Sequence, residues 1–172
     1  MKIAIVSDTH GNVANFKKVI KWLNKENIQT ILHCGDIGAP DALNDSLVDF
    51  KRNCFGVLGN MDKDFRFLIG EYNKIPKVEI AEDNLEKEID GKKIAITHFP
   101  AIAKKMAESK KYDIVFYGHT HKPWEEMVGS CRLINPGELA GQYYKPTFAV
   151  YDTVTGDLEL KILERISMTV KN

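Results

Sequence analysis

Five short polar signatures in this chain contain residue types that bind metal ions, and each of them follows an apolar run. Along the chain they are Asp8-Thr9-His10, Gly35-Asp36, Gly59-Asn60-Met61-Asp62, Thr97-His98 and Gly118-His119-Thr120-His121. The apolar runs before them are residues 3–6, 30–32, 55–58, 94–96 and 114–117. Strands of one parallel sheet end along a common edge, where open α/β folds bind ligands. Carboxylates and imidazoles gathered there would suit Mn, Fe, Zn or Ni.

The number of candidate ligands favours two metal ions over one. The candidates are Asp8, His10, Asp36, Asn60, His98, His119 and His121, which are too many for one tetrahedral zinc. A pair of ions about 3.5–4 Å apart needs a bridging carboxylate and a few terminal ligands for each ion. Taken singly, each signature is more typical of an ordinary turn or a structural histidine. Their conjunction, each after a strand-like run, is what predicts a metal centre.

The first third of the chain alternates strands and helices. We expect strands at residues 2–6, 30–33 and 54–58, and helices at about residues 12–27 and 41–50, where apolar residues follow helical spacing. Pro40 stands near the first turn of the second helix. This β-α-β-α-β order predicts a parallel sheet with right-handed crossovers.

The rest of the chain has an antiparallel character. Alternation at residues 77–81 and 85–89 predicts two strands, and Asp90-Gly91 predicts a hairpin turn into a strand at residues 93–97. A helix is expected at residues 101–110 and a buried strand at 113–117. The segments 125–128 and 131–134, and then 147–152 and 158–163, are expected to form two further hairpins. We therefore predict two packed sheets flanked by helices, in a single domain of residues 1–172.

Composition and charge are typical of a water-soluble protein. Apolar residues make up 44% of the chain and charged residues 28%, and 24 basic residues balance 24 acidic ones. This balance does not indicate a nucleic-acid-binding surface, and it leaves homo-oligomer formation open. No apolar run approaches the ~18 residues of a membrane span, and a strand is expected directly after Lys2, which leaves no room for a signal peptide. Three isolated cysteines, Cys34, Cys54 and Cys131, are expected to be reduced, as in a cytoplasmic protein.

The five signatures together resemble those of the calcineurin-like metallophosphoesterases. The short length, His33-Cys34-Gly35-Asp36 and Ile134-Asn135-Pro136-Gly137 resemble the small YfcE-type phosphodiesterase branch. The resemblance covers residues 1 to about 152 and implies a four-layer α/β/β/α sandwich of two mixed sheets. It also implies the ligand sets: Asp8, His10, Asp36 and His121 for the first metal, and Asp36, Asn60, His98 and His119 for the second. Asp36 would bridge the two ions.

Two positions depart from the pattern of the family. Many relatives have a histidine that acts on the leaving group where this chain has Met61, and a methionine cannot donate a proton. Relatives of the small branch commonly continue with Gly-His at the His98 position, where this chain has Phe99-Pro100. Met61 and Phe99 either form an apolar wall for an aromatic or base group or pack against the sheet. We expect His33 to be structural, and Trp124, Tyr143 and Tyr144 to lie in the core or at an interface.

The function predicted from these observations is a metal-dependent phosphoesterase, more specifically a phosphodiesterase acting on a small phosphodiester. A hydroxide bridging two Mn, Ni, Fe or Zn ions would attack phosphorus in line, with Asp36, Asn60 and His98 as the catalytic residues. The alternatives are a non-catalytic scaffold on the same fold and a metal- or nucleotide-sensing protein. A chain that had become a scaffold would not need the whole ligand set.

Overall fold

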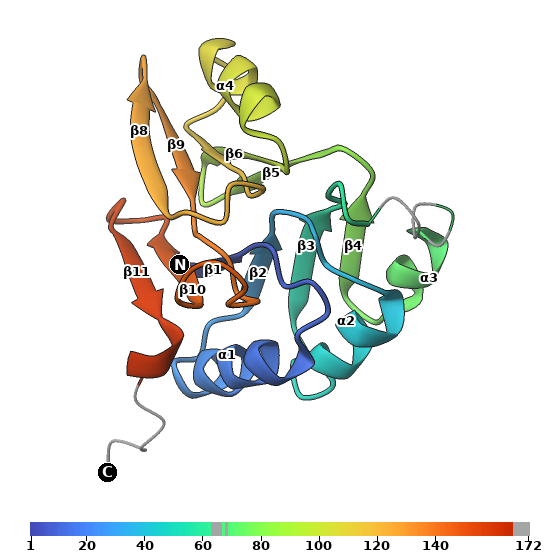
Figure 1. The fold of residues 1–172 in the computed structure, drawn as a ribbon. Coiled ribbons are helices and arrows are strands. Elements are labelled where there is room, and N and C mark those ends of the chain that lie inside the picture. The colour runs from blue at the N-terminus through green and yellow to red at the C-terminus, as the bar shows by residue number, and fades with distance from the viewer. Residues whose placement is uncertain (63–66, 68, 167–172) are drawn as a thin grey trace.

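The computed structural model describes residues 1–62, 67 and 69–166, and two sheets packed face to face form its centre (Figure 1). The first sheet consists of β1 (Lys2–Val6), β2 (Thr30–His33), β3 (Asn53–Val57), β4 (Val78–Ala81), β10 (Thr147–Asp152) and β11 (Leu158–Ile162). Its order is β11-β10-β1-β2-β3-β4. The strands β1 to β4 are mutually parallel, whereas β10 runs antiparallel to β1 and to β11.

The second sheet is also mixed. It consists of β5 (Asn84–Ile89), β6 (Lys92–Thr97), β7 (Ile114–Phe116), β8 (Trp124–Val128) and β9 (Cys131–Asn135). Its order is β5-β6-β7-β9-β8, with β6, β7 and β9 parallel and the two edge strands antiparallel to their neighbours. The turn between β5 and β6 has positive φ at both Asp90 and Gly91, as the Asp-Gly signal predicted.

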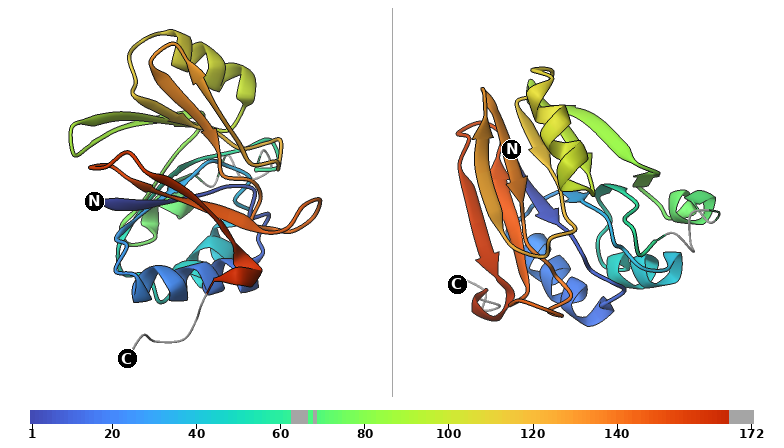
Figure 2. Two further views of the ribbon diagram at one scale, coloured as in Figure 1. Left: turned by 90° about the vertical axis from the view of Figure 1, so that its left-hand side faces the viewer. Right: turned by 45° about the horizontal axis from the view of Figure 1, so that its top comes forward.

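Helices cover the outer faces of both sheets, which makes four layers (Figure 2). The helices α1 (Val13–Lys25), α2 (Pro40–Leu47) and α3 (Ile69–Lys74) lie beside the first sheet, and α4 (Pro100–Glu108) lies beside the second. A single 3-10 turn, Leu163–Arg165, follows β11. The four-layer α/β/β/α sandwich predicted from the family resemblance is confirmed.

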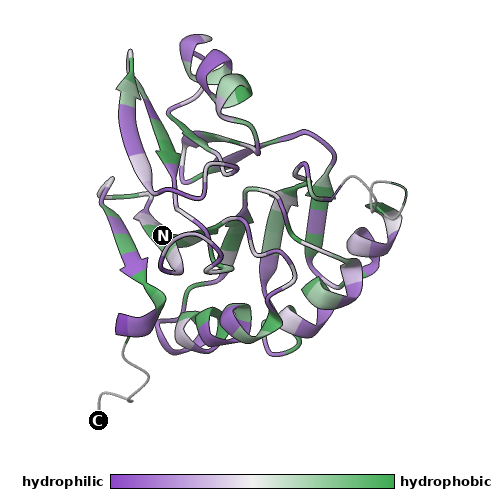
Figure 3. Cartoon of the chain, viewed as in Figure 1, coloured by the Kyte–Doolittle hydropathy of each residue, from purple (hydrophilic) through white to green (hydrophobic). Residues whose placement is uncertain are grey.

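Three apolar layers hold the sandwich together. Because successive side chains of a strand point to opposite faces, Ala4 and Val6 of β1 pack under α1 and α2, whereas Ile3 and Ile5 pack between the sheets. A third cluster joins α4 to the second sheet. Figure 3 shows apolar residues (green) along the strands of both sheets. Each fully buried Ile, Leu or Val contributes about 1.5–3 kcal/mol, so the strands are rigid supports for the loops that follow them.

The expected elements are present with small shifts at their ends, and one element was missed. The segment 77–81 forms β4, which extends the parallel part of the first sheet. The helix α3, which leads into β4, was not predicted. The carboxyl-terminal limit of the expected domain, residue 172, lies outside the described residues. Within the part of the chain that the structure describes, no helix is long and apolar enough to cross a membrane.

Candidate metal centre

All seven candidate ligands lie in loops that directly follow strands. Asp8 and His10 follow β1, Asp36 follows β2, and Asn60 follows β3. His98 follows β6, and the pair His119 and His121 follows β7. Four ligands therefore come from the first sheet and three from the second. The contacts described next bring them together at the edge where the two sheets meet.

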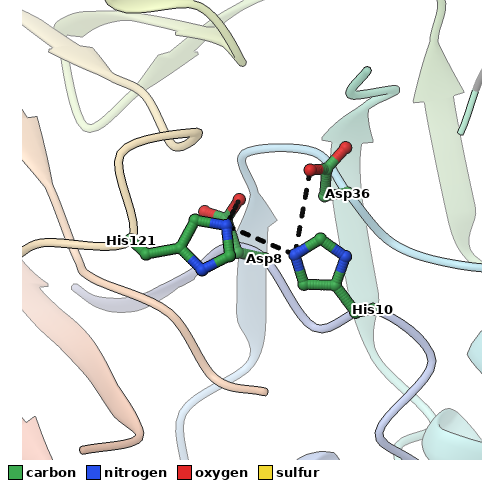
Figure 4. A group of neighbouring side chains, drawn as sticks. All are labelled: Asp8, His10, Asp36 and His121. Carbon is green, nitrogen blue, oxygen red and sulfur yellow. Dashed lines mark hydrogen bonds and ion pairs between the residues drawn. The ribbon is translucent and has the colours of Figure 1, made fainter. Parts of the chain in front are cut away.

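The first group consists of Asp8, His10, Asp36 and His121, whose donor atoms all lie within 4.8 Å of one another. His121 Nε2 is 3.4 Å from Asp8 Oδ1, and His10 Nε2 is 3.8 Å from Asp36 Oδ2. The two imidazole Nε2 atoms of His10 and His121 are 3.4 Å apart. Figure 4 shows the four side chains pointing toward one another from three different loops. This group matches the first of the two predicted ligand sets.

The second group shares Asp36 with the first. His98 Nε2 lies 3.5 Å from Asp36 Oδ2 and 2.9 Å from Asn60 Oδ1. The same amide oxygen of Asn60 lies 2.7 Å from His119 Nδ1. The oxygen Asp36 Oδ2 therefore faces an imidazole of each group. The structure brings together all seven residues that the sequence predicted.

Neighbouring groups orient the imidazoles and the carboxylate of Asp36. His98 Nδ1 lies 2.8 Å from the carbonyl oxygen of Cys34, which only accepts, so Nδ1 carries the hydrogen and Nε2 faces Asp36. The backbone N–H of Met61 donates to Asp36 Oδ1 at 2.8 Å. Such partners fix the tautomer and direction of metal ligands.

The backbone around the site is unusually constrained. Asp8, His10, Asp36, His119 and His121 all have positive φ, between 45° and 70°. Non-glycine residues rarely adopt this left-handed conformation, and it persists only where the surrounding structure enforces it. Five of the seven candidate ligands share it.

Two glycines allow the ligand loops to approach one another closely. A Cβ atom on Gly59 would lie 2.1 Å from Asp36 Oδ1, and one on Gly35 would lie 2.5 Å from His98 Nδ1. Any larger residue would displace a candidate ligand. The glycine in Gly35-Asp36 and in Gly59-Asn60 therefore has a steric reason.

Burial changes the ionisation of the site in a way that fits cation binding. Burial, with the nearby Asp36 adding to it, raises the pKa of Asp8 to about 7, although His121 opposes the shift. Burial also lowers the pKa values of His10 and His98, which keeps their imidazoles in the neutral form that binds metals. Two buried carboxylates with neutral imidazoles lack the positive charge that would offset their desolvation. A divalent cation supplies it, so the donor set fits a metal.

Two carboxylates that sequence reasoning gave no role support these loops. Asp62 accepts the backbone N–H groups of Ile37, Gly38 and Gly59 at 2.8–3.0 Å, so it joins the loops after β2 and β3. Its place in the Gly-Asn-Met-Asp signature was the available signal. Glu138, whose side chain is fully buried, lies with Oε2 3.0 Å from His121 Nδ1. The only sequence signal for Glu138 was its position just after the Asn135-Pro136-Gly137 turn.

His33 is structural, as predicted. Its side chain is fully buried, Nε2 lies 3.0 Å from the Thr9 hydroxyl, and Nδ1 accepts the N–H of Gly35 at 3.2 Å. Burial lowers its pKa to about 3, so the ring is neutral. It braces the loops that carry Asp8 and Asp36 and does not join either ligand group.

The core alternative predicted for Trp124, Tyr143 and Tyr144 is wrong, and their place at an interface stays a prediction. Trp124 and Tyr144 are 50% exposed and Tyr143 is 75% exposed. The two tyrosines lie in a loop between β9 and β10 that contains Gly141 and Pro146, and the rings of Tyr143 and His121 pack nearly perpendicular to each other with centroids 5.0 Å apart. Adjacent aromatic residues suggested burial, but this loop holds them at the surface.

A cleft of about 450 Å³ opens over the two ligand groups. Its lining includes His10, Asp36, Asn60, Met61, His119, Thr120, His121, Gln142, Tyr143 and Tyr144. Met61 is 61% exposed and forms part of the wall. Phe99 instead packs against the rings of His98 and His119 at 5.1 and 5.3 Å between centroids. Met61 therefore lines the cleft, whereas Phe99 packs on the two histidine rings rather than against the sheet.

Comparisons with known proteins agree on one family for this chain. A profile described as the calcineurin-like phosphoesterase superfamily domain matches residues 1–156. Phosphodiesterase MJ0936 of Methanocaldococcus jannaschii is 35% identical over 168 residues, which cover 95% of this chain and 100% of that protein. The solved structure of a novel archaeal phosphodiesterase superposes with a TM-score of 0.85 at 33% identity, covering 94% of this chain and 99% of the other.

More distant structures share the fold. YfcE, a phosphoesterase from E. coli, superposes with a TM-score of 0.67 at 17% identity, over 95% of this chain and 100% of the other. Vacuolar protein sorting 29 from Cryptosporidium parvum does so with a TM-score of 0.67 at 18% identity, over 93% and 95%. At these identities the likeness shows the fold alone. The matches confirm the predicted family, and the relative that is 35% identical supports the catalytic interpretation over a scaffold.

Proposed function

This chain belongs to the calcineurin-like phosphoesterase superfamily, and we propose that it is a metal-dependent phosphodiesterase that hydrolyses a small phosphodiester. One observation carries the proposal. The carboxylate of Asp36 lies between two groups of ligands, with Oδ2 at 3.8 Å from His10 Nε2 and 3.5 Å from His98 Nε2. A single ion would leave one of these groups without a cation.

Two divalent ions fit the donor set. Asp8, His10, Asp36 and His121 would hold one ion, and Asp36, Asn60, His98 and His119 would hold the other. Mn, Ni, Fe and Zn all accept this mixture of imidazole and carboxylate ligands. When bound, such a pair supplies positive charge for the phosphoryl oxygens and lowers the pKa of a water molecule toward neutrality.

The protein's own residues contribute positioning and charge balance. The carboxylates of Asp8 and Asp36 would hold the cations in a fixed place. Because the loops that carry these carboxylates are already in position, the charges would not have to be reoriented when substrate binds. Asn60 contributes a neutral oxygen, so the second group keeps more net positive charge than the first once both ions are present. We infer that Asp36, Asn60 and His98 contact the reacting region most directly.

The cleft indicates the kind of ester group that fits. Met61, Tyr143 and Tyr144 add apolar and aromatic surface to its lining, and aromatic surfaces stack well on planar groups. We propose a diester with at least one aryl or base-like group.

The first prediction is the metal stoichiometry. Metal-free protein saturated with Mn²⁺ is expected to bind two ions per chain by elemental analysis, and to cleave a bis-aryl phosphodiester with Mn²⁺ or Ni²⁺. The Asn60→Ala and His98→Ala variants are expected to bind one. A stoichiometry of one in the unaltered protein, unchanged in these variants, contradicts the dinuclear centre.

We further propose that the chain forms one domain and works in a reducing compartment such as the cytoplasm. The apolar layer between the sheets contains residues of both sheets, so the two sheets share this core. Cys34, Cys54 and Cys131 are buried free thiols, which are typical of reducing compartments. Limited proteolysis that releases a stable fragment would contradict the single domain.

A further inference from the structure

Glu138 is a buried carboxylate whose hydrogen-bond partners come from two different parts of the site. Its Oε1 atom accepts the backbone N–H groups of Tyr143 and Tyr144 at 2.6 and 2.5 Å. Its Oε2 atom accepts the N–H of Gln142 at 2.8 Å and lies 3.0 Å from His121 Nδ1. Three donors belong to the cleft wall and one belongs to a candidate metal ligand.

The loop that Glu138 holds, residues 138–146, will be called the tyrosine loop. Its first residues are fixed to the site from the other side, because Leu139 and Ala140 donate their N–H groups to the carbonyls of Ser7 and Asp8 at 3.0 Å. Asn12 also donates to the carbonyl of Ala140 at 3.0 Å. Residues 142–144 have no such backbone partner among these contacts, so the carboxylate of Glu138 is what brings them back over His121.

Glu138 also determines which nitrogen of His121 is available. A carboxylate that already accepts three N–H groups is an acceptor toward His121 too, so Nδ1 of His121 carries the hydrogen. Nε2 is then the bare nitrogen, and it is the atom that faces Asp8 and His10. The ring of Tyr143 packs against the same imidazole and nearly perpendicular to it.

We propose that Glu138 is a positioning residue that couples the tyrosine loop to His121, so that the wall of the cleft and the first ligand group share one support. The expected effect of Glu138 on catalysis rests on the proposed function, whereas its effect on the loop and on His121 does not. A substrate group that orders the tyrosines also orders His121, and binding of a metal ion at His121 in turn orders the loop. Such coupling is reciprocal by thermodynamic necessity.

The Glu138→Gln variant tests the coupling because it keeps the shape and removes one acceptor. The retained amide oxygen best serves the two short bonds from Tyr143 and Tyr144, which turns the NH₂ group toward Gln142 and His121. His121 can then satisfy the NH₂ group only by accepting at Nδ1, which moves its hydrogen to Nε2. We expect histidine ¹H–¹⁵N spectra of the metal-free variant to show this change of tautomer.

Two further measurements start from the same metal-free protein, and a third uses the Mn²⁺-loaded protein. Hydrogen exchange at the Gln142 amide is expected to accelerate by about 10- to 100-fold, as for a lost hydrogen bond to a charged group. Mn²⁺ affinity for the first group is expected to fall by about 10- to 100-fold, the usual effect of removing a partner of a ligand histidine. With saturating Mn²⁺, the KM for an aryl diester is expected to rise more than kcat falls.

Glu164→Gln is the matched control. Glu164 pairs with Lys145 of the same loop at 3.0 Å, but both side chains are exposed, and exposed pairs contribute little. This variant is expected to leave the tautomer, the exchange and the Mn²⁺ affinity unchanged. If Glu164→Gln changed them as much as Glu138→Gln, the specific role of Glu138 would be wrong.

The unaltered protein provides a test that does not depend on a variant's folding. Mn²⁺ is expected to slow exchange of amides 142–144, and His121→Ala is expected to abolish that slowing. The coupling is overturned if Mn²⁺ does not change the exchange rates of these amides. It is also overturned if Glu138→Gln changes either loop exchange or the His121 tautomer without the other. The tautomer, exchange and Mn²⁺-affinity readouts need no substrate, so a failure of phosphodiesterase activity would leave them interpretable and would count against the proposed function alone.

Discussion

The carboxylate of Asp36 faces both groups of candidate ligands. It is 2% exposed, its Oδ1 accepts the N–H of Met61, and its Oδ2 faces imidazoles on both sides. A bridging carboxylate offsets the repulsion between two cations, whereas an amide of the same shape brings only a dipole. The charge of Asp36 should therefore matter more than the bulk of any cleft residue.

Asp36→Asn is expected to lower kcat/KM for an aryl phosphodiester by at least about 100-fold, in the range of lost electrostatic stabilisation. Met61→Ala is expected to cost about tenfold or less, since one apolar contact in an open cleft is worth about 1 kcal/mol. Both variants should be assayed with saturating Mn²⁺ and measured metal content. Equal losses in two folded, metal-loaded variants would show that the roles are wrongly divided.

The presence of a methionine at position 61 also leads to a prediction about how the rate depends on the acidity of the leaving group. A positioned acid typically contributes roughly 10²–10⁴-fold, and methionine has no proton to give. Aryl diesters are therefore expected to be cleaved much faster than alkyl ones, and Met61→His is expected to narrow the difference. Rates across a series of substituted phenols measure the dependence. A flat dependence with chemistry rate-limiting would mean that another group donates the proton.

At the scale of the elements, the ends of strands from different sheets approach so closely that only glycine fits between them. Gly118 follows β7, and a Cβ atom there would lie 2.0 Å from Ser7 Oγ, 2.8 Å from Asp8 Oδ2 and 2.9 Å from the Cys34 carbonyl. These three atoms belong to loops of the first sheet. Gly118 is thus the point where the second sheet meets the loops that carry Asp8 and Asp36.

Gly118→Ala is expected to destabilise the protein by about 1–3 kcal/mol, as overpacking does, and to weaken Mn²⁺ binding because Asp8 must move. Gly70→Ala is the control, since a Cβ atom on Gly70 in α3 meets nothing within 4 Å and alanine favours a helix. Urea unfolding and Mn²⁺ titration of both variants provide the comparison. A Gly118→Ala protein with unchanged Mn²⁺ affinity would contradict the steric argument.

The sequence predicted those features that local patterns encode. Strand ends were visible because an apolar run gives way to a polar signature, and this placed all seven candidate ligands. The helix α3 was missed because six residues are too few to display a helical period. Glu138 was missed because its partners are created when residues 142–144 fold back over it, and no periodic pattern records that. The core alternative for the tyrosines was wrong for the same reason.

At the scale of the whole molecule, the site lies at the seam of the sandwich and concentrates buried charge there. Asp8 is fully buried and accepts the His119 N–H group at 3.1 and 3.3 Å. Its pKa is nonetheless raised, mainly by burial, from 3.8 to about 7. A carboxyl that is easier to protonate in the folded state opposes folding once it ionises. The metal-free protein is therefore less stable with this carboxylate ionised than without it, a trade-off that is common at functional sites.

The sign of this effect gives the last prediction. Below about pH 4 Asp8 is protonated in both folded and unfolded chains and costs nothing. As the pH rises from about 4 through 7, the unfolded chain releases this proton first, so the folded state becomes less stable by up to about 4 kcal/mol.

Asp8→Asn cannot ionise and keeps an acceptor for His119. With a chelator present, it should be more stable than the unaltered protein at pH 8, by about 1–4 kcal/mol, and the difference should shrink toward pH 4. With Mn²⁺ the order should reverse, since a ligand that binds only the folded state stabilises it and the variant binds it more weakly. Urea unfolding across this pH range measures both arms. An Asp8→Asn variant that is less stable at pH 8 without metal would mean that the carboxylate is already compensated by the protein, and that its burial does not depend on a cation.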